Sequence, residues 1–130
     1  MNTQFEQVKR YIGNLGFEIA SENIEDEILL ISDEDRGIMN LVIDCEEPIL
    51  IFEQFIGIIR ENNAETYKRL LQMNRHLVHG AFVLDSDSDR LLFRDTLQLR
   101  NLDENEVEGT ISALSLAMSE YGHELIKICK

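Results

Sequence analysis

Apolar side chains recur every three or four positions in three stretches of the chain, and this spacing predicts three helices. The first predicted helix covers 2–15 and the second covers roughly 63–78. The third follows Asp103, and Gly122 is expected to end its regular part early. Each stripe covers one side of its helix, so each helix should pack one face against a core.

Two pairs of residues have the spacing of a capping box, in which a side chain at the helix start accepts a hydrogen bond from a backbone N–H three residues later. The pairs are Asn62 with Glu65 and Asp103 with Glu106. Asn74 lies inside the apolar stripe of the second helix, where a buried amide needs hydrogen-bond partners. A structural polar role is the first interpretation of Asn74, and a position facing a groove is the alternative.

Shorter apolar runs separated by turn residues predict strands between the helices. These runs are 17–24, 27–33, 38–45, 48–55, 81–85 and 90–99. The last two flank Ser-Asp-Ser-Asp at 86–89, which predicts a hairpin, whereas 56–62 fits either a longer strand or a helical turn. Because the strands are joined by short connections, neighbours should pair antiparallel. The fold class is α+β, in the order α-β-β-β(-β)-α-β-β-α, with one domain over 1–130.

Two of the predicted strands are apolar on both faces, at 28–31 and 49–52. One face of the sheet must receive the helices, so a homodimer would bury the other face. A stable interface typically buries about 800 Å² per partner, which two extra apolar strand faces can supply in scale. We expect Tyr67, Leu71 and Leu91 to contribute to this interface.

The charge of the chain narrows its partners and its location. Twelve Lys+Arg against 25 Asp+Glu give a formal charge of −13, which disfavours binding to nucleic acid or to anionic membranes. The charged N-terminus and the absence of a long apolar run predict a cytoplasmic protein. Cys45 and Cys129 are best interpreted as two reduced thiols.

No motif indicates catalysis, a metal or a cofactor. The Asp-rich run at 85–89 begins like a calcium loop, but Arg90 and Thr96 stand where that loop needs glycine and glutamate. His76 and His79 have a spacing that two metal ligands could use, yet nothing near them in sequence completes a site. Phosphate-binding glycine loops and the nucleophile elbow are absent from the sequence. We therefore expect a non-enzymatic protein without a cofactor.

A set of turn and apolar positions in the second half of the chain resembles the YbjN-like proteins and the related Tir-chaperone (CesT-like) family of type III secretion chaperones. The positions are Asn74, Gly80, Phe82, Leu84, Asp85, Asp87, Leu91, Leu92, Arg94, Leu97 and Leu99, followed by a capped amphipathic helix. The resemblance implies an α+β fold with a twisted antiparallel sheet, commonly dimeric. It also implies that apolar patches hold an extended or partly unfolded client, without enzymatic chemistry.

The expected function is therefore a chaperone-like module that binds a polypeptide by apolar contacts and by strand addition at a sheet edge. Phe5, Val8 and Tyr11 on the first helix are the expected client contacts. The alternative is a YbjN-like regulatory or small-molecule-sensing domain. Such a domain would use a cavity between helices and sheet, with His76 or His79 lining it.

Overall fold

A computed structural model describes residues 3–130 as three α-helices, six strands and one short 3₁₀ turn. In chain order the elements are α1 (Thr3–Asn14), β1 (Ile19–Asn23), β2 (Ile28–Asp33), η1 (Glu34–Arg36), β3 (Ile38–Glu46), β4 (Ile49–Ile58), α2 (Ala64–Asn74), β5 (Ala81–Leu84), β6 (Arg90–Gln98) and α3 (Glu104–Ile128). The predicted α+β class and element order are confirmed, with the fourth strand present.

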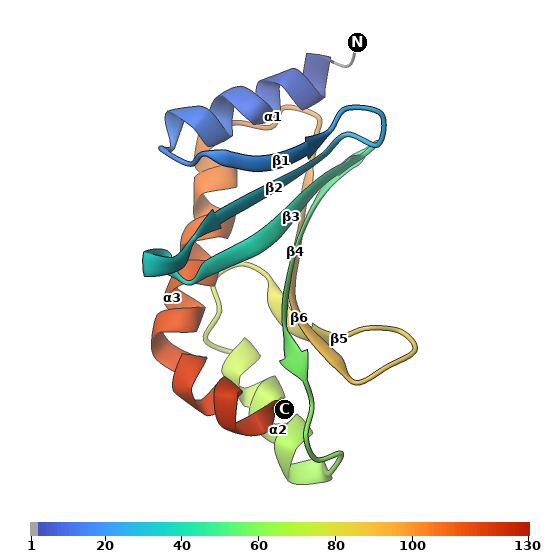
Figure 1. Cartoon of the computed structure of the whole chain (residues 1–130), viewed down its shortest axis with the longest axis vertical. Coiled ribbons are helices and arrows are strands. Elements are labelled where there is room, and N and C mark those ends of the chain that lie inside the picture. The colour runs from blue at the N-terminus through green and yellow to red at the C-terminus, as the bar shows by residue number, and fades with distance from the viewer. Residues whose placement is uncertain (1–2) are drawn as a thin grey trace.

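All six strands form one twisted sheet in the order β1-β2-β3-β4-β6-β5 (Figure 1). Every neighbouring pair is antiparallel, and the longest ladder joins β4 to β6, from Ile49 opposite Gln98 to Ile58 opposite Arg90. Because β6 pairs with β4, the hairpin after α2 returns to the sheet beside the strand that precedes that helix. The sheet therefore ends in β1 on one side and β5 on the other.

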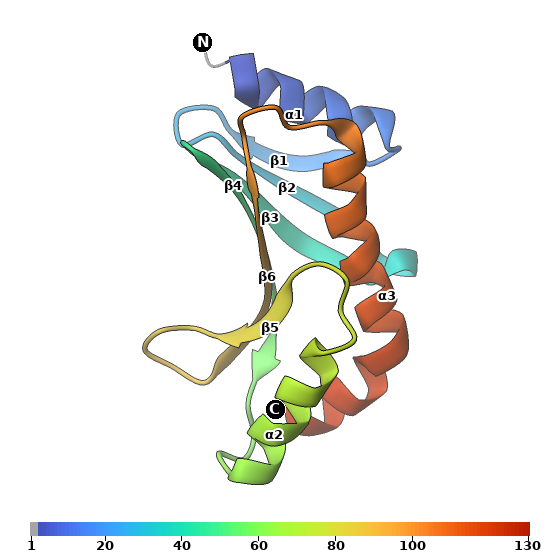
Figure 2. The same cartoon turned by 180° about the vertical axis from the view of Figure 1, so that it is seen from behind.

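The helices lie on one side of the sheet and at its ends. Figures 1 and 2 show α3 running across one face, with α1 at the β1 end and α2 at the β5 end. The hydroxyl of Tyr11 in α1 donates to the carbonyl of Leu102 at 3.1 Å, which ties α1 to the segment that enters α3. Among residues 3–130, one face of the sheet is thus covered by helix and the opposite face is not.

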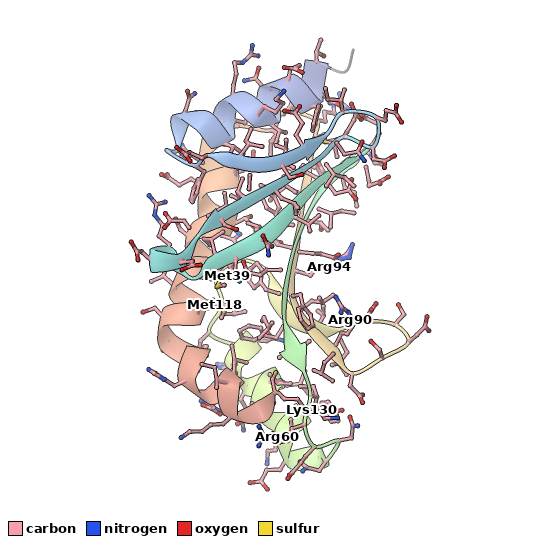
Figure 3. The ribbon with its side chains drawn as sticks, in the orientation of Figure 1. Met39, Arg60, Arg90, Arg94, Met118 and Lys130 are labelled. Carbon is pink, nitrogen blue, oxygen red and sulfur yellow. The ribbon has the colours of Figure 1, made fainter. Side chains whose placement is uncertain are left out.

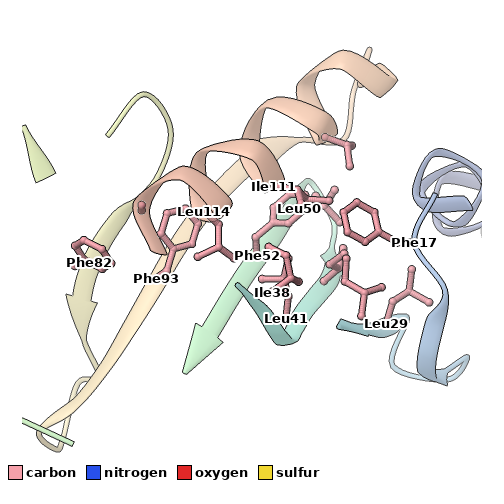
Figure 4. Close-up of a cluster of buried hydrophobic side chains, with 14 of the residues drawn as sticks. Phe17, Leu29, Ile38, Leu41, Leu50, Phe52, Phe82, Phe93, Ile111 and Leu114 are labelled. Carbon is pink, nitrogen blue, oxygen red and sulfur yellow. The ribbon is translucent and has the colours of Figure 1, made fainter. Parts of the chain in front are cut away.

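The core lies between the covered face and α3 because strand side chains alternate and every second one points to the helix. Phe52 and Phe93 are fully buried on neighbouring strands, and Ile111 and Leu114 of α3 pack into the same cluster (Figure 4). Phe82 meets Phe93 edge to face, with ring centroids 6.4 Å apart. The apolar stripe of α3 and the period of two in the strands thus complete one continuous core.

The start of α2 differs from the predicted cap by one residue. Asn63, not Asn62, caps the helix, since its Oδ1 accepts from the backbone N–H of Thr66 at 2.9 Å. Asn62 instead donates from Nδ2 to Asp89 in the hairpin turn, at 3.0 Å. The predicted cap at Asp103 is confirmed by a 2.9 Å bond from the N–H of Glu106.

The end of α2 also differs from the prediction, because the helix stops at Asn74 and not at 78. There the Asn74 side chain turns to β5 and bonds the backbone of Phe82. Gly80 has φ of 75° and leads the chain into β5. A Cβ at Gly80 would lie 2.5 Å from the Phe93 ring, so this position requires glycine for space as well as for conformation.

Two further boundaries, the end of α3 and the end of β4, are now defined. The prediction that Gly122 ends α3 early is wrong, since the helix continues to Ile128. An interior glycine costs a helix only about 1 kcal/mol, which the packing of α3 outweighs. The open stretch 56–62 begins as strand, because β4 runs to Ile58 and Ile59 then pairs with Cys129.

Candidate binding face of the sheet

The face of the sheet away from α3, which we call the open face, carries a continuous set of apolar side chains. They are Ile28, Leu30, Val42, Ile51, Phe55, Val83 and Leu92. Within residues 3–130, no helix lies over them (Figures 1 and 2). Most are half-buried by one another, and Phe55 remains 45% exposed.

Strand register brings these side chains together from segments far apart in sequence. Leu30 lies opposite Val42 across β2 and β3. Farther along the sheet, Leu92 lies between Phe55 of β4 and Val83 of β5. Directly opposite side chains in an antiparallel pair are about 5 Å apart, so they form a joint surface. The open face therefore spans five strands, from β2 to β5.

Asp44 is the polar centre of this face. It lies opposite Ile28 on one side and Ile51 on the other. Its Oδ1 is buried and has no hydrogen-bond partner among the described residues. Burial, followed by the neighbouring Glu46, raises the pKa of the Asp44 carboxyl to about 6. The open face thus holds an acceptor atom that the fold itself does not satisfy.

Arginines occupy the other half of the open face. Arg94 pairs with Glu53 at 3.2 Å across β6 and β4. The Arg90 guanidinium lies over the Phe55 ring, 4.2 Å from its centroid, in cation–π geometry. Figure 3 shows both arginines on the strands toward the β5 side. Arg90 also lies 3.7 Å from Asp85, so both arginines on this half of the face are paired with carboxylates.

The two edge strands of the sheet differ in whether their outward-pointing backbone groups already have hydrogen-bond partners. At the β5 edge, Asn74 accepts from the N–H of Phe82 at 2.7 Å and donates to its carbonyl at 3.1 Å. These are the bonds that an added strand would make, so Asn74 occupies that place. The β1 edge is largely exposed, and Lys9 of α1 reaches Glu22 there at 2.8 Å.

The three expected client contacts do not lie on the open face. Phe5 and Val8 are buried in the core, because α1 turns its apolar stripe toward the covered face. Tyr11 is half-buried and bonds Leu102. Phe5 and Val8 therefore offer no surface to a client in this fold, and we do not retain them as contacts.

The three expected dimer residues are placed apart. Leu91 is buried on the covered side of β6, so its expected place in an interface is wrong for this fold. Leu71 on α2 is 70% exposed. Tyr67, one turn earlier, is half-buried and donates its hydroxyl to Asn62. Only α2 therefore presents this predicted surface.

The two strands predicted to be apolar on both faces, 28–31 and 49–52, contribute Ile28, Leu30 and Ile51 to the open face, but the rest of it was not identified from the sequence. Val42 and Leu92 could have been predicted from the sequence, because β3 and β6 each have apolar side chains on both faces. Phe55 was harder to find, because β4 carries a register shift between Phe55 and Gly57 that breaks the alternation.

His79 and the two cysteines provide structural contacts, and His76 is exposed. His79 packs on α3 beside Gly109, where a Cβ would lie 3.1 Å from Nε2. Burial raises the pKa of the Cys45 thiol to about 12 and also raises that of Cys129. Both thiols are therefore protonated at neutral pH and are poor nucleophiles. No helix within residues 3–130 has the length and apolar character needed to cross a membrane.

The fold is similar to that of solved chaperone structures. A chain in the crystal structure of the Yersinia pestis type III secretion chaperone SycH with a fragment of YscM2 is similar, at TM-score 0.59 and 15% identity, with 97% of this chain and 99% of that chain covered. A chain of the heterodimeric ExoU–SpcU complex of Pseudomonas aeruginosa gives TM-score 0.65 and 18% identity, covering 95% and 98%.

The E. coli YbjN structure gives TM-score 0.71 and 13% identity, with 92% of each chain covered. No curated protein sequence matches the chain. The fold is thus that of the type III secretion chaperones and of YbjN. The sequence model of the CesT_Tir_1 family matches residues 1–130, and the chain belongs to this family.

Proposed function

We propose that this protein is a chaperone-like module that holds a polypeptide client without catalysis. The observation that carries the proposal is the open face, an apolar surface over five strands that no described helix covers. Uncovered apolar surface of this extent commonly marks a binding site. Membership of the CesT_Tir_1 family and likeness to chaperones solved with partner polypeptides support it.

The client would lie across the open face with apolar side chains against Leu30, Val42 and Leu92. Asp44 would accept a hydrogen bond from a client N–H or ammonium group, which would satisfy its buried Oδ1. A client that supplies a cation would also lower the raised pKa of Asp44. The preferred client segment is therefore apolar with a basic residue.

Strand addition belongs to the β1 edge in this proposal. Asn74 already bonds the outward backbone groups of Phe82, so an added strand at β5 would have to displace it. The β1 edge is exposed from Ala20 to Asn23 and offers backbone without that obstacle.

A second copy would use α2. Leu71 and, in the loop that follows, Val78 are both strongly exposed apolar side chains. In place of the expected homodimer through the second face of the sheet, we propose that Leu71 and Val78 contribute to a homodimer and leave the open face to the client. Leu71→Glu should then convert a dimer to monomer in light scattering, whereas Leu116→Glu, an equally exposed site on α3, should not. The two buried unpaired thiols fit a reducing compartment such as the cytoplasm.

Suppression of insulin aggregation after reduction, followed by light scattering, tests client holding. Wild-type protein should suppress aggregation, and the double variant Leu30→Thr with Ile51→Thr should lose most of this activity. Leu116→Gln is the matched control, since it removes an exposed leucine outside the open face. Equal activity of all three proteins would contradict the open face as the client site. Inactive wild-type protein would favour the YbjN-like regulatory or ligand-sensing alternative.

A further inference from the structure

An apolar hollow lies on the helix side of the molecule, between the C-terminal half of α3 and the end of β4. Its volume is about 330 Å³. Its apolar lining comes from a stripe of α3 that includes Met118, Leu125 and Ile126, and from Ile56 across the gap. Ile56 is the residue that the β4–β6 register skips, which frees it from the ladder.

The rim of this hollow is cationic. Arg60 and Lys130 line it, and no acidic residue does, although the chain has 25 Asp+Glu against 12 Lys+Arg. Backbone pairing holds the two cations at this end, since the Arg60 N–H donates to Ile128 O and the Lys130 N–H donates to Ile58 O, each at 2.8 Å. Figure 3 shows both residues where β4 meets the end of α3. Neither forms an ion pair within residues 3–130.

Two acidic residues, Glu61 and Glu124, line an adjoining hollow together with Arg60, and Glu124 is paired with Arg69. Glu124 accepts two hydrogen bonds from Arg69, at 2.6 and 2.9 Å, and this pairing lowers the pKa of its carboxyl. The Arg60 guanidinium donates to the Cys129 carbonyl at 3.4 Å, and neither Arg60 nor Lys130 is paired with a carboxylate among residues 3–130, so both positive charges are available to a partner. Charge complementarity then selects an anionic occupant, and the apolar floor selects one with an apolar group beside the charge.

Gly122 keeps the hollow open. Gly122 lies in the interior of the α3 sequence and lines the hollow. A Cβ at this position would have no atom within 4 Å. Glycine at such a position costs helix stability relative to almost any other residue. A side chain at 122 would instead project into the space.

We infer that this hollow binds an acidic segment of a polypeptide partner, with one apolar side chain seated over Gly122 and flanking carboxylates at Arg60 and Lys130. The inference rests on the proposed function in one respect, that the partner is a polypeptide. Small ligands usually have most of their surface enclosed, whereas Ile126 at the rim is 72% exposed, so an occupant that covers it must extend beyond the hollow. The cations of this hollow would bind acidic residues, whereas Asp44 on the open face would bind a basic residue.

Fluorescence anisotropy tests this with two labelled twelve-residue peptides. Each carries one central phenylalanine, flanked by Glu and Asp in one peptide and by Lys in the other. The acidic peptide should bind more tightly, and added salt should weaken it because the contact is electrostatic and exposed. Arg60→Glu with Lys130→Glu should weaken it by about tenfold, since each exposed ion pair contributes modestly. Arg10→Glu with Arg100→Glu makes the same charge change elsewhere and should have much less effect.

The decisive variant is Gly122→Leu, which fills the hollow while improving helix propensity. It should abolish binding of the acidic peptide without lowering the unfolding temperature. Gly13→Leu is the matched control, because Gly13 in α1 also has no atom within 4 Å of a built Cβ. It should leave the affinity unchanged.

Three results would overturn the inference. They are equal binding of both peptides, full binding by Gly122→Leu, and octanoate binding as tightly as the acidic peptide, which would indicate a small-molecule site. Insulin holding is measured in parallel on the same proteins. If wild-type protein suppresses insulin aggregation but does not bind the acidic peptide, only this inference is rejected. If wild-type protein does not suppress aggregation, the proposed function is rejected.

Discussion

Leu92 and Phe93 are neighbours in β6, yet they belong to two different surfaces. Phe93 points to α3, is fully buried and packs against Phe82. Leu92 points the other way and is half-buried between Phe55 and Val83. The same alternation runs through β3, where Ile43 is buried on the covered face and Val42 lies on the open face. The sheet therefore has two apolar faces, and the helices of residues 3–130 cover one of them.

The difference shows how one sequence pattern serves stability and binding separately. Burial of apolar area contributes about 25 cal/mol per Å², so the covered face contributes most of the folding free energy. The open face has already lost part of its area to side-chain neighbours and carries Asp44, Glu53 and Arg94 among its apolar residues. Such a mixed face stays soluble when empty and still offers apolar contacts to a partner.

The largest effect is expected from Phe93→Ala on the covered face. Loss of a fully buried phenylalanine typically costs about 3–5 kcal/mol, because transfer and cavity terms add. Urea unfolding followed by circular dichroism measures the change. Phe55→Ala on the open face should cost less than about 1 kcal/mol, since Phe55 is half exposed. Equal losses from the two variants would contradict the contrast between the faces.

Asn74→Ala should have the next largest effect, because it removes the group that closes the β5 edge. Both backbone groups of Phe82 would lose their partner, at a cost of about 2–3 kcal/mol in the free energy of unfolding. Hydrogen exchange should also become faster at the Phe82 N–H. Asn74→Asp keeps one acceptor and should retain the bond to that N–H. An Asn74→Ala variant as stable as wild-type protein would show that water replaces both bonds.

The sequence predicted elements well where the signal is local. The cap at Asp103 and the turn at 86–89 depend on residues a few positions apart, and the structure contains both. Alternation likewise predicted both hairpin strands. Local chemistry did not distinguish Asn62 from Asn63, because the choice depends on Asp89, which is distant in sequence.

The candidate site was harder to predict, because an apolar stripe does not specify what it packs against. Phe5 and Val8 have the spacing of a binding helix and of a core helix alike, and only tertiary structure placed them in the core. Leu91 and Leu92 illustrate the same limit, since a shift of one position moves a side chain to the other face. The hollow beside Gly122 combines β4, α3 and Arg60, which no local pattern connects.

Asp44→Asn should increase the free energy of unfolding, by less than Phe93→Ala and Asn74→Ala decrease it. The pKa of Asp44 is raised from 3.8 to about 6 in the folded protein, so the folded state binds its proton more tightly than the unfolded chain. Wild-type stability therefore falls as pH rises through this window. The variant lacks the ionisation and should be more stable at pH 7.5 by about 1–2 kcal/mol, allowing for partial exposure, with the difference vanishing near about pH 4.

Urea unfolding at both pH values measures this effect. Asp87→Asn in the exposed β5–β6 turn is the control and should change stability by less than about 0.5 kcal/mol. If the difference in stability between Asp44→Asn and wild-type protein did not depend on pH, ionisation of Asp44 would not destabilise the folded protein.

Leu92→Thr should have a small effect on stability and a larger effect on client holding. Threonine keeps β-propensity, and the site is half-buried, so the variant should lose less than about 1 kcal/mol of unfolding free energy. It removes an apolar group from the centre of the Phe55–Leu92–Val83 row, so suppression of insulin aggregation should fall severalfold. Phe93→Thr, one residue away, should unfold the protein at much lower urea concentration. If Leu92→Thr were as unstable as Phe93→Thr while holding clients normally, the open face would be part of the folding core and the client would bind elsewhere.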